Sequence, residues 1–282
     1  MFQNSYQFEN IYTIKGNNIY EGKFSIIFDV NSLQNENYVL KLYKTWVPFD
    51  LFLNELENCR NLCWEQNPDF IRYISSSEED NIFGENYILF EKAQKGSLDE
   101  YLTNISLEFP EIEKKVIFCK IAEMVERLHL LHYCHGNICF QNIFVNQQYQ
   151  LRLGDFGSAK TFYLQNNISE RAQKDDIKSL GILLLYLITG KQNFENKENF
   201  WSLLKLNKKE LILEQNFIEL IESMLDNNYQ NRPDFNTIYN SHYFDDIRNQ
   251  NAFYATEIAL QNRFREIDEF LHSENFDNLI HS

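Results

Sequence analysis

The sequence has little basic charge, no long apolar run and no membrane-targeting feature. It contains 26 Lys and Arg against 41 Asp and Glu, a formal charge of −15 over 282 residues. A basic face is missing, which argues against nonspecific nucleic-acid binding and against docking on anionic lipid. The longest apolar run, 180–188, falls far short of the ~20 residues that a spanning helix needs. We therefore expect neither nucleic acid nor a membrane as partner.

Cysteine shows no pairing pattern. The five cysteines are odd in number and contain no C-x-x-C motif, so free thiols in a reducing cytosol are expected. Cys59 and Cys63 are spaced i, i+4 and could ligate a metal, but no matching His/Cys pair accompanies them, and core packing is favoured. Residues 1–5 lack the basic and apolar regions of a signal peptide, which favours a cytoplasmic location.

The composition is that of a folded protein, and the sequence pattern divides into two regions. Apolar residues make up 44 % and aromatics 15 %, and the length allows two modest lobes. The pattern predicts strands and one helix up to about residue 92, and mostly helices from about 96 to 246. The segments predicted are strands at 24–28, 37–43 and 87–90, a hairpin loop at 31–35, a solvated turn at 75–80, and helices at 50–64, 116–132 and 179–189.

Four polar residues carry the groups that a polyphosphate site uses. Lys41 ends a strand triplet, Glu55 lies on the following helix, and Asn142 precedes Asp155 of a D-F-G triplet. An ammonium neutralises phosphate charge, and amide and carboxylate oxygens are ligands that Mg²⁺ prefers. Glu57 is an alternative partner for Lys41, but it would lie about 200° around the helix from Glu55.

The segments His-Gly-Asn-Ile-Cys-Phe-Gln-Asn at 135–142 and Asp-Phe-Gly at 155–157 resemble the H-R-D-L-x-x-x-N and D-F-G motifs of protein kinases. Further matches at 89–98, 176–181 and 231–233 extend the resemblance over residues 8–246. It implies an α+β, bilobal kinase-like fold with a small β-rich N-lobe (about 8–92), a larger helical C-lobe (about 93–246) and a C-terminal helical extension (247–282). It also implies that Asp176 accepts hydrogen bonds from the catalytic-loop backbone and that Arg232 pairs with the glutamate of an A-P-E motif.

The resemblance further implies a cleft for ATP and Mg²⁺, with Phe90 as gatekeeper and a regulatory stack of Cys59, Tyr73, His135 and Phe156. Asn142 and Asp155 would hold the metal. Val39 and Phe144 stand where smaller side chains are usual and narrow the adenine slot. The nucleotide-binding residues it implies are Gly22, Ile27, Val39, Lys41, Glu55, Glu91, Ala93, Asn142, Phe144 and Asp155.

Several departures weaken the case for catalysis. Asn137 occupies the position of the catalytic base, whose contribution is typically ~10²–10⁴-fold. Gly136 replaces the arginine of H-R-D, and Cys139 replaces the basic residue that steadies the transferring phosphate. No A-P-E motif is present, and Asp155 and Asp176 are too close for a full activation segment. In the phosphate loop only the middle glycine, Gly22, remains.

These departures favour a catalytically impaired pseudokinase that acts as a regulatory or scaffolding module with weak Mg-ATP binding. The His-Gly-Asn triplet also resembles, locally, the pseudokinase domains of the Janus family. The alternative is a divergent, slow serine/threonine kinase that transfers the ATP γ-phosphate to protein hydroxyls. A scaffold with an empty cleft is a third interpretation. A protein partner is expected in the first and third cases, but the sequence does not identify it.

The C-terminal region predicts a helix over 252–271. Its apolar residues are spaced by 7, 4, 3 and 4, which puts them on one face: Phe253, Leu260, Phe264, Ile267 and Leu271. An isolated helix is marginal in water, so this face must be covered. Docking on the chain's own C-lobe is the favoured interpretation, and an interface with a partner or a second copy is the alternative.

Overall fold

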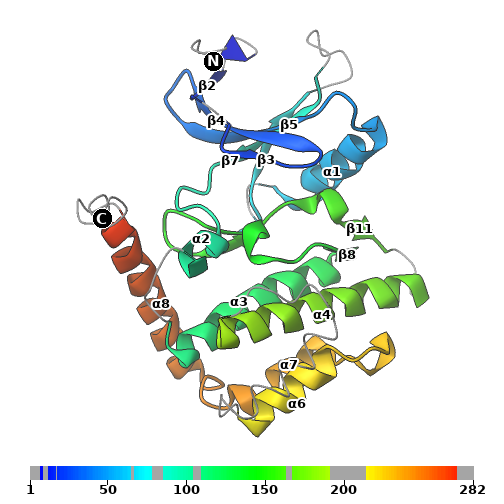
Figure 1. Ribbon diagram of the computed structural model, residues 1–282, viewed down its shortest axis with the longest axis vertical. Helices are drawn as coiled ribbons and strands as arrows, with labels where there is room; N and C mark the ends of the chain where they lie inside the picture. The colour runs from blue at the N-terminus through cyan, green and yellow to red at the C-terminus, as the bar shows by residue number, and fades with distance from the viewer. Residues whose placement is uncertain are drawn as a thin grey trace.

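The computed structural model describes residues 7–8, 12–16, 18–64, 67–77, 85–103, 109–162, 167–190 and 214–271. These residues form two lobes, with a sheet and one helix above a mostly helical lobe (Figure 1). The mixed α+β, bilobal architecture expected from the sequence is confirmed.

The N-lobe is built on a seven-stranded sheet in the order β1-β2-β4-β5-β7-β6, with β3 also paired to β4. Alternation along β5 buries Leu40 on one face and leaves Lys41 on the other, toward the C-lobe. The strands are β1 (Gln7–Phe8), β2 (Tyr12–Ile14), β3 (Tyr20–Glu21), β4 (Ser25–Ser32), β5 (Asn37–Tyr43), β6 (Tyr73–Ser76) and β7 (Tyr87–Glu91).

Two predicted turns in the N-lobe are wrong in extent. Strand β4 continues to Ser32, and the turn is closed by Ser32 N–H donating to the Glu36 carbonyl at 2.9 Å. Asn35 supplies the left-handed conformation (φ 63°) that the turn needs. Ser75 and Ser76 belong to β6 rather than to a solvated turn. Because these two residues are polar, the sequence pattern did not predict a strand here, although its backbone pairs with β7.

Helix α1 (Phe49–Leu62) covers one face of the sheet, close to the predicted range. It begins after Pro48, which cannot donate a backbone hydrogen bond and suits the entry to a helix. Phe52 and Leu56 pack with Tyr43 and Ile88 of the sheet. Glu55 is on this buried side, whereas Glu57 is exposed.

The C-lobe is organised around α3, which is almost entirely enclosed. A long apolar set on α3, from Val116 to Leu128, packs against the other helices of the lobe. The helices are α2 (Leu98–Thr103), α3 (Glu111–Leu130), α4 (Asn167–Thr189), α6 (Gln215–Met224), α7 (Phe235–Tyr239) and α8 (Gln250–Leu271). Two short two-stranded antiparallel sheets lie under the N-lobe: the hairpin of β9 (Ile143–Val145) with β10 (Leu151–Leu153), and the more distant pair β8 (Tyr133–Cys134) with β11 (Lys160–Thr161).

Helix α4 starts at Asn167, twelve positions before the predicted 179–189 segment. The added turns carry mostly polar residues (167–178), so they lack the apolar periodicity on which the prediction depended. The buried part of the helix, including Leu180 and Leu184, agrees with the prediction. The early start of α4 shortens the connection between the Asp155-Phe156-Gly157 triplet and this helix.

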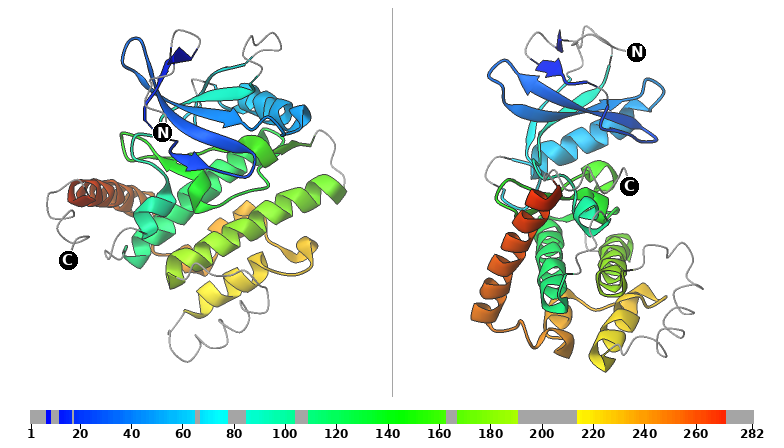
Figure 2. Two further views of the ribbon diagram at one scale, coloured as in Figure 1. Left: turned by 45° about the horizontal axis from the view of Figure 1, so that its top comes forward. Right: turned by 60° about the vertical axis from the view of Figure 1, so that its left-hand side comes forward.

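Helix α8 lies alongside α3, as the views in Figure 2 show. Leu260, Phe264 and Ile267 of the predicted stripe are at most 4 % exposed, and Phe264 packs on Tyr101 and Phe109. Ion pairs flank the contact, including Lys120 with Glu257 at 3.0 Å and Arg263 with Glu113. These three residues of the stripe are therefore buried against the chain's own C-lobe, and Phe253 is half-buried beside them. The side chain of Leu271 lies outside the described residues.

Four of the five cysteines are buried and none is in a disulfide. Cys59 and Cys63 are both 0 % exposed within the apolar core, as the packing interpretation expected. Among the described helices, none has both the length and the apolar character required to cross a bilayer.

Candidate nucleotide-binding cleft

Three charged side chains meet between the lobes. Lys41 Nζ lies 2.7 Å from Glu55 Oε1 and 2.7 Å from Asp155 Oδ1. Burial alone would lower the pKa of Lys41, but the two carboxylates outweigh it and raise that pKa. Burial alone would raise the pKa of Asp155, but the Lys41 ammonium holds it below its usual value. Lys41 is therefore charged and Asp155 ionised at neutral pH, and Asp155 is about a third exposed.

Tyr43 supports this group and was not identified from the sequence. Its hydroxyl donates to Glu55 Oε2, and burial, with the nearby Glu55 carboxylate, raises its pKa so that the donor stays protonated. Lys41 Nζ lies 5.8 Å from its ring centroid. The sequence did contain a signal for this role, because residues 41 and 43 are two apart on one strand and therefore share a face.

The Asp155-Phe156-Gly157 triplet is held under α1. Asp155 adopts a left-handed conformation (φ 60°), and Phe156 is 1 % exposed with its ring 5.3 Å from His135. The Asn58 amide donates to the Phe156 carbonyl at 3.0 Å and the Ala159 carbonyl at 2.9 Å. Asn58 lies one turn after Glu55, so one helix fixes both the carboxylate and the triplet.

The predicted stack is partly visible as direct contact. His135 and Phe156 touch, while Cys59 and Tyr73 belong to the same apolar cluster or pack against it. Phe70, which was not predicted, packs its ring 5.2 Å from that of Phe156.

The loop containing Asn137 is anchored from below by Asp176. Asp176 accepts the His135 N–H at 2.8 Å and the Gly136 N–H at 2.9 Å, the contact that the resemblance implied. His129 Nε2 lies 2.8 Å from the same carboxylate. Cys134 is close by, and burial raises the pKa of its thiol to about 12. Because both oxygens of Asp176 are already engaged, we interpret this buried group as an anchor of the loop rather than a metal centre.

Within the loop, Asn137 is exposed and offers an amide where a base would stand. Its N–H donates to His135 Nδ1 at 3.2 Å, and its carbonyl accepts from the Asn142 amide nitrogen at 2.9 Å. His135 Nε2 donates to the Gly154 carbonyl at 3.1 Å, and burial lowers the His135 pKa, so the ring is neutral. Oδ1 of Asn142 is the atom of that side chain that could coordinate Mg²⁺.

Gly136 is required by its backbone conformation. Its φ of 74° is disfavoured for other residues, and a Cβ there would lie 2.9 Å from the Ser158 carbonyl oxygen. An arginine therefore does not fit this arrangement. The segment after Gly157 crosses the place where that side chain would start.

The connection between the triplet and α4 is short and partly paired. β11 pairs with β8, placing Lys160 opposite Cys134, and α4 begins at Asn167, ten positions after Gly157. The predicted partner of Arg232 was wrong. With no A-P-E glutamate in the chain, its Nη1 lies 2.7 Å from Asp175 Oδ1, which the early start of α4 brings within reach.

At the adenine end, Phe144 is half-buried beside Gly154. A Cβ on Gly154 would lie 2.9 Å from Phe144 Cε2, so glycine makes room for this ring. Ile27 and Val39 lie on the cleft-facing side of β4 and β5, where Ile27 pairs with Lys41 and Val39 with Phe90. The larger Phe144 ring is thus accommodated partly by a neighbour that lacks a side chain.

Residues 91–95 connect the two lobes, and three ion pairs link this segment to its surroundings. Glu91 Oε1 lies 2.9 Å from Arg152 Nη1 of β10, and Lys92 Nζ lies 2.7 Å from Asp29 of β4. Lys95 pairs with Asp268 of α8. The Ala93 carbonyl accepts the Gly96 N–H at 3.2 Å, which turns the chain into the C-lobe.

The phosphate loop is a tight hairpin. The Gly22 N–H donates to the Ser25 carbonyl at 2.9 Å, so this amide is engaged within the turn. Tyr20 is exposed beside it.

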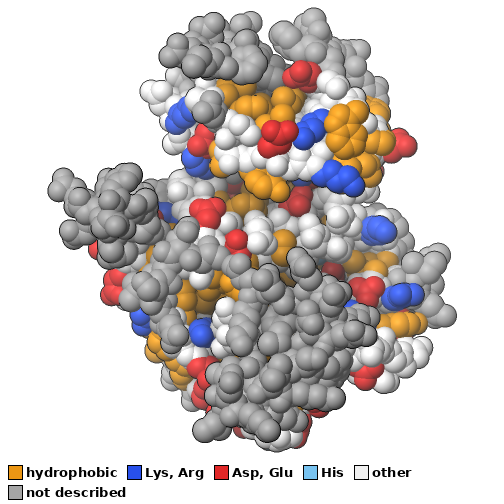
Figure 3. All heavy atoms as spheres, in the orientation of Figure 1, with side chains coloured by type: hydrophobic (Ala, Val, Ile, Leu, Met, Phe, Trp, Pro, Cys, Tyr) orange, Lys and Arg blue, Asp and Glu red, His pale blue; other side chains and the backbone are white. Residues whose placement is uncertain are grey.

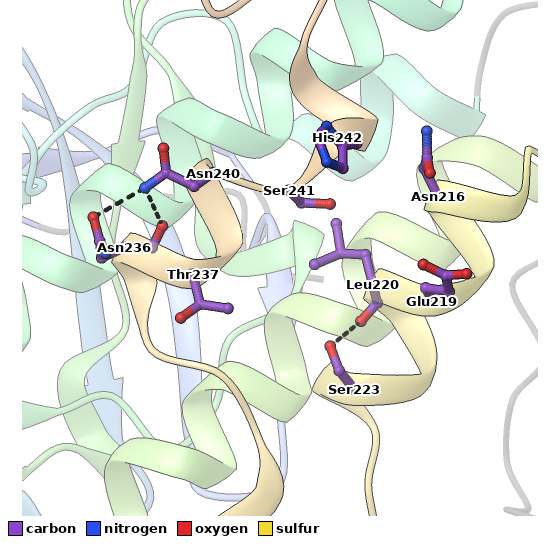
Figure 4. A pocket seen from close by; sticks show the side chains of 9 residues that line it. All are labelled: Asn216, Glu219, Leu220, Ser223, Asn236, Thr237, Asn240, Ser241 and His242. Carbon is purple, nitrogen blue, oxygen red and sulfur yellow. Dashed lines mark hydrogen bonds between the residues drawn. The ribbon is translucent and has the colours of Figure 1, made fainter.

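A second hollow lies at the base of the C-lobe between α6 and the segment from α7 to His242 (Figure 4). Its volume is about 470 Å³ and its walls carry amide and hydroxyl side chains. The Asn240 amide donates to the Asn236 carbonyl at 2.9 Å, and the Ser223 hydroxyl to that of Leu220 at 2.7 Å. The Asn240 and Ser223 side chains are thus engaged with nearby carbonyls. The charged group of Lys41, Glu55 and Asp155 lies between the lobes, and we take that region as the candidate functional site.

The family model for the protein kinase domain matches residues 14–244, more than half of the chain. The chain therefore belongs to the protein kinase family. Similar curated proteins include serine/threonine-protein kinase ppk6 of Schizosaccharomyces pombe, 29 % identical over 204 residues, and cell cycle serine/threonine-protein kinase CDC5/MSD2 of Saccharomyces cerevisiae, 24 % identical over 209 residues. A probable inactive receptor-like protein kinase of Arabidopsis thaliana, At3g56050, is 26 % identical over 137 residues.

These matches are partial. They cover 64 %, 65 % and 44 % of this chain, respectively. They correspond to only 25 %, 29 % and 27 % of the three relatives' lengths, so the similarity spans less than a third of each relative.

Proposed function

We propose that the chain is a pseudokinase, a kinase domain that regulates or scaffolds a protein partner without useful phosphotransfer. The observation that carries this proposal is the early start of helix α4 at Asn167, which leaves nine residues between the helix and Gly157. A substrate peptide docks on an activation segment, and this stretch is too short for a complete one. Asn137 adds to the loss, because an amide cannot accept the proton of the attacking hydroxyl.

The intact contact of Lys41 with Glu55 and Asp155 favours an alternative, a slow serine/threonine kinase. Phosphoryl transfer depends mainly on positioning and electrostatics, so loss of the base alone would leave some rate. Two of the relatives carry the name serine/threonine-protein kinase, whereas a third is named as probably inactive. The names therefore leave both functions open and an experiment must decide.

The deciding experiment restores the base. The Asn137→Asp variant is expected to show no phosphate transfer to itself or to casein above the background of Lys41→Ala, measured with labelled Mg-ATP. In a site that is otherwise competent, this change would raise the rate by about 10²–10⁴-fold. A gain of that size, abolished by adding Lys41→Ala, would establish the slow kinase and contradict the pseudokinase.

We further propose weak Mg-ATP binding in the cleft, because the residues present fit the group. Lys41 would contact phosphate, and Asn142 and Asp155 would hold Mg²⁺, which supplies charge neutralisation when bound. Adenine would lie among Ile27, Val39 and Phe144, with backbone groups of 91–93 at its edge. Binding to the native state alone raises apparent stability, so Mg-ATP is expected to raise the melting temperature.

Two variants test this binding. Asp155→Ala should abolish the difference between the shifts produced by Mg-ATP and by ATP with EDTA, while Asp50→Ala, an exposed carboxylate on α1, should keep it. Phe144→Leu should lower the Kd if the ring crowds the slot. An unchanged or higher Kd would contradict the crowding argument. A melting temperature that no nucleotide shifts would favour the scaffold with an empty cleft.

A further inference from the structure

The carboxylate of Glu55 has a second partner besides Lys41. Lys41 Nζ lies 2.7 Å from Glu55 Oε1 and 2.8 Å from Oε2, and it also lies 2.7 Å from Asp155 Oδ1. The Tyr43 hydroxyl donates to Glu55 Oε2 from the same strand as Lys41. One carboxylate thus accepts hydrogen bonds from an ammonium and from a neutral hydroxyl, and the ammonium is shared with another acidic group.

Glu55 depends on these two donors because its side chain is almost fully enclosed. The side chain is 3 % exposed, in contrast to the acidic side chains visible at the surface where the lobes meet in Figure 3. A buried carboxylate without partners is strongly disfavoured, and a hydrogen bond to a charged group is stronger than one between neutral groups. Gly157 leaves space for the carboxylate, since a Cβ there would lie 2.7 Å from Glu55 Oε2. Within the described residues, Glu55 is therefore held by Lys41 and Tyr43 together.

Tyr43 is fixed in position by the sheet and by α1. Its N–H donates to the Asn86 carbonyl at 2.8 Å, and its ring is edge-on to that of Phe52, with centroids 5.2 Å apart. The residue is 6 % exposed, and burial with the nearby Glu55 carboxylate raises its pKa, so the hydroxyl keeps its proton. Because the donor is already ordered by this packing, little further entropy is lost in making the hydrogen bond.

Lys41 has a competing demand that Tyr43 does not have. A phosphate in the cleft, as proposed above, would take up N–H groups of the ammonium, and the two carboxylates around Lys41 would share fewer of them. Tyr43 is neutral and buried, so phosphate does not compete for its hydroxyl. The hydrogen bond from Tyr43 to Glu55 therefore persists while Lys41 is engaged with phosphate.

We propose that Tyr43 is a positioning residue, whose hydroxyl holds Glu55, and with it α1, in place when Lys41 turns to phosphate. Asn58 supports the same helix position through the Phe156 carbonyl. Helix α1 then offers a partner the same surface with and without nucleotide, which suits a module that acts by contact. The inference rests on the proposed nucleotide site for this consequence alone, since the hydrogen bond is present without nucleotide.

The test is native-state hydrogen exchange of the α1 amides, measured on the whole chain without nucleotide. Tyr43→Phe removes the hydroxyl and keeps the ring, and the protection of the amides around Glu55 should fall about tenfold. The matched control is Tyr38→Phe. It removes the hydroxyl that Tyr38, on the same strand, donates to the exposed Glu36, and it should leave the protection of α1 unchanged.

Two further backgrounds separate this role from simple packing. In Glu55→Gln the acceptor is uncharged, so adding Tyr43→Phe should lower α1 protection by no more than about threefold. In Lys41→Met the ammonium is gone, so adding Tyr43→Phe should lower α1 protection by more than it does in the wild type. Tyr43→Phe should also raise the Kd of Mg-ATP several-fold, because Glu55 then competes with phosphate for Lys41.

Three results would overturn the proposal. One is α1 protection that Tyr43→Phe leaves unchanged. Another is an equal loss in the wild type and in Glu55→Gln, because the residue would then act through packing. The third is a wild-type chain that binds Mg-ATP with a Kd that Tyr43→Phe does not change. A wild-type chain that binds no Mg-ATP would contradict the nucleotide site, and the exchange measurements would still decide whether Tyr43 positions Glu55.

Discussion

Replacing Phe264 by alanine is expected to lower the free energy of unfolding by about 3–5 kcal/mol. The side chain is 0 % exposed, and its ring packs 5.0 Å from Tyr101 and 5.6 Å from Phe109. Removing it leaves a cavity between α8 and the C-lobe that the surrounding rings cannot fill. The measurement is urea denaturation followed by circular dichroism, where the midpoint falls and the slope stays constant.

Tyr254→Ala is the matched control for this prediction. Tyr254 is an aromatic on the same helix, but it is 52 % exposed, so its removal should change stability by no more than about 0.5 kcal/mol. Equal, small losses for the two variants would mean that α8 is not docked in solution. The apolar stripe would then be available to a partner or a second copy, the alternative that the sequence left open.

The position of α8 shows what periodicity can predict. The 7-4-3-4 spacing located the face that had to be covered, because period and burial are linked in any helix. It could not identify the covering surface, since the 150 positions between Arg263 and Glu113 carry no local signal of their contact. The same limit applies to Lys95 and Asp268, 173 positions apart.

The charged group of the cleft was predictable from motif resemblance. Lys41, Glu55 and Asp155 were identified because they match, in order, the positions of protein kinase motifs, and they meet in the structure. Tyr43 and Asn58 were missed because their roles depend on the strand face and helix turn they share with Lys41 and Glu55.

The partner of Arg232 could not be predicted by resemblance. A motif-based pairing assumes that the activation segment ends as it does in other kinases, and here that segment is replaced by the first turns of α4. Those turns bring Asp175 to the guanidinium, so a buried arginine keeps a carboxylate partner after the usual one is lost.

Asp176→Ala is expected to destabilise the chain because it releases the loop that contains Asn137. Asp176 is 1 % exposed and holds this loop by accepting hydrogen bonds from the N–H groups of His135 and Gly136. Leaving two such donors without an acceptor costs about 1–3 kcal/mol each, so unfolding should become easier by about 2–6 kcal/mol.

Hydrogen exchange of the His135 and Gly136 amides tests the cause directly, because their protection should fall toward that of exposed loops in Asp176→Ala. Asp245→Ala, which removes an exposed carboxylate from a surface ion pair, should leave both amides and the overall stability nearly unchanged. If the two amides stay protected in Asp176→Ala, the loop is held instead by the His135 ring on the Gly154 carbonyl. Two results together would show that the chain keeps this loop conformation for structural reasons alone. The His135 and Gly136 amides would lose protection in Asp176→Ala, and no variant of the chain would transfer phosphate.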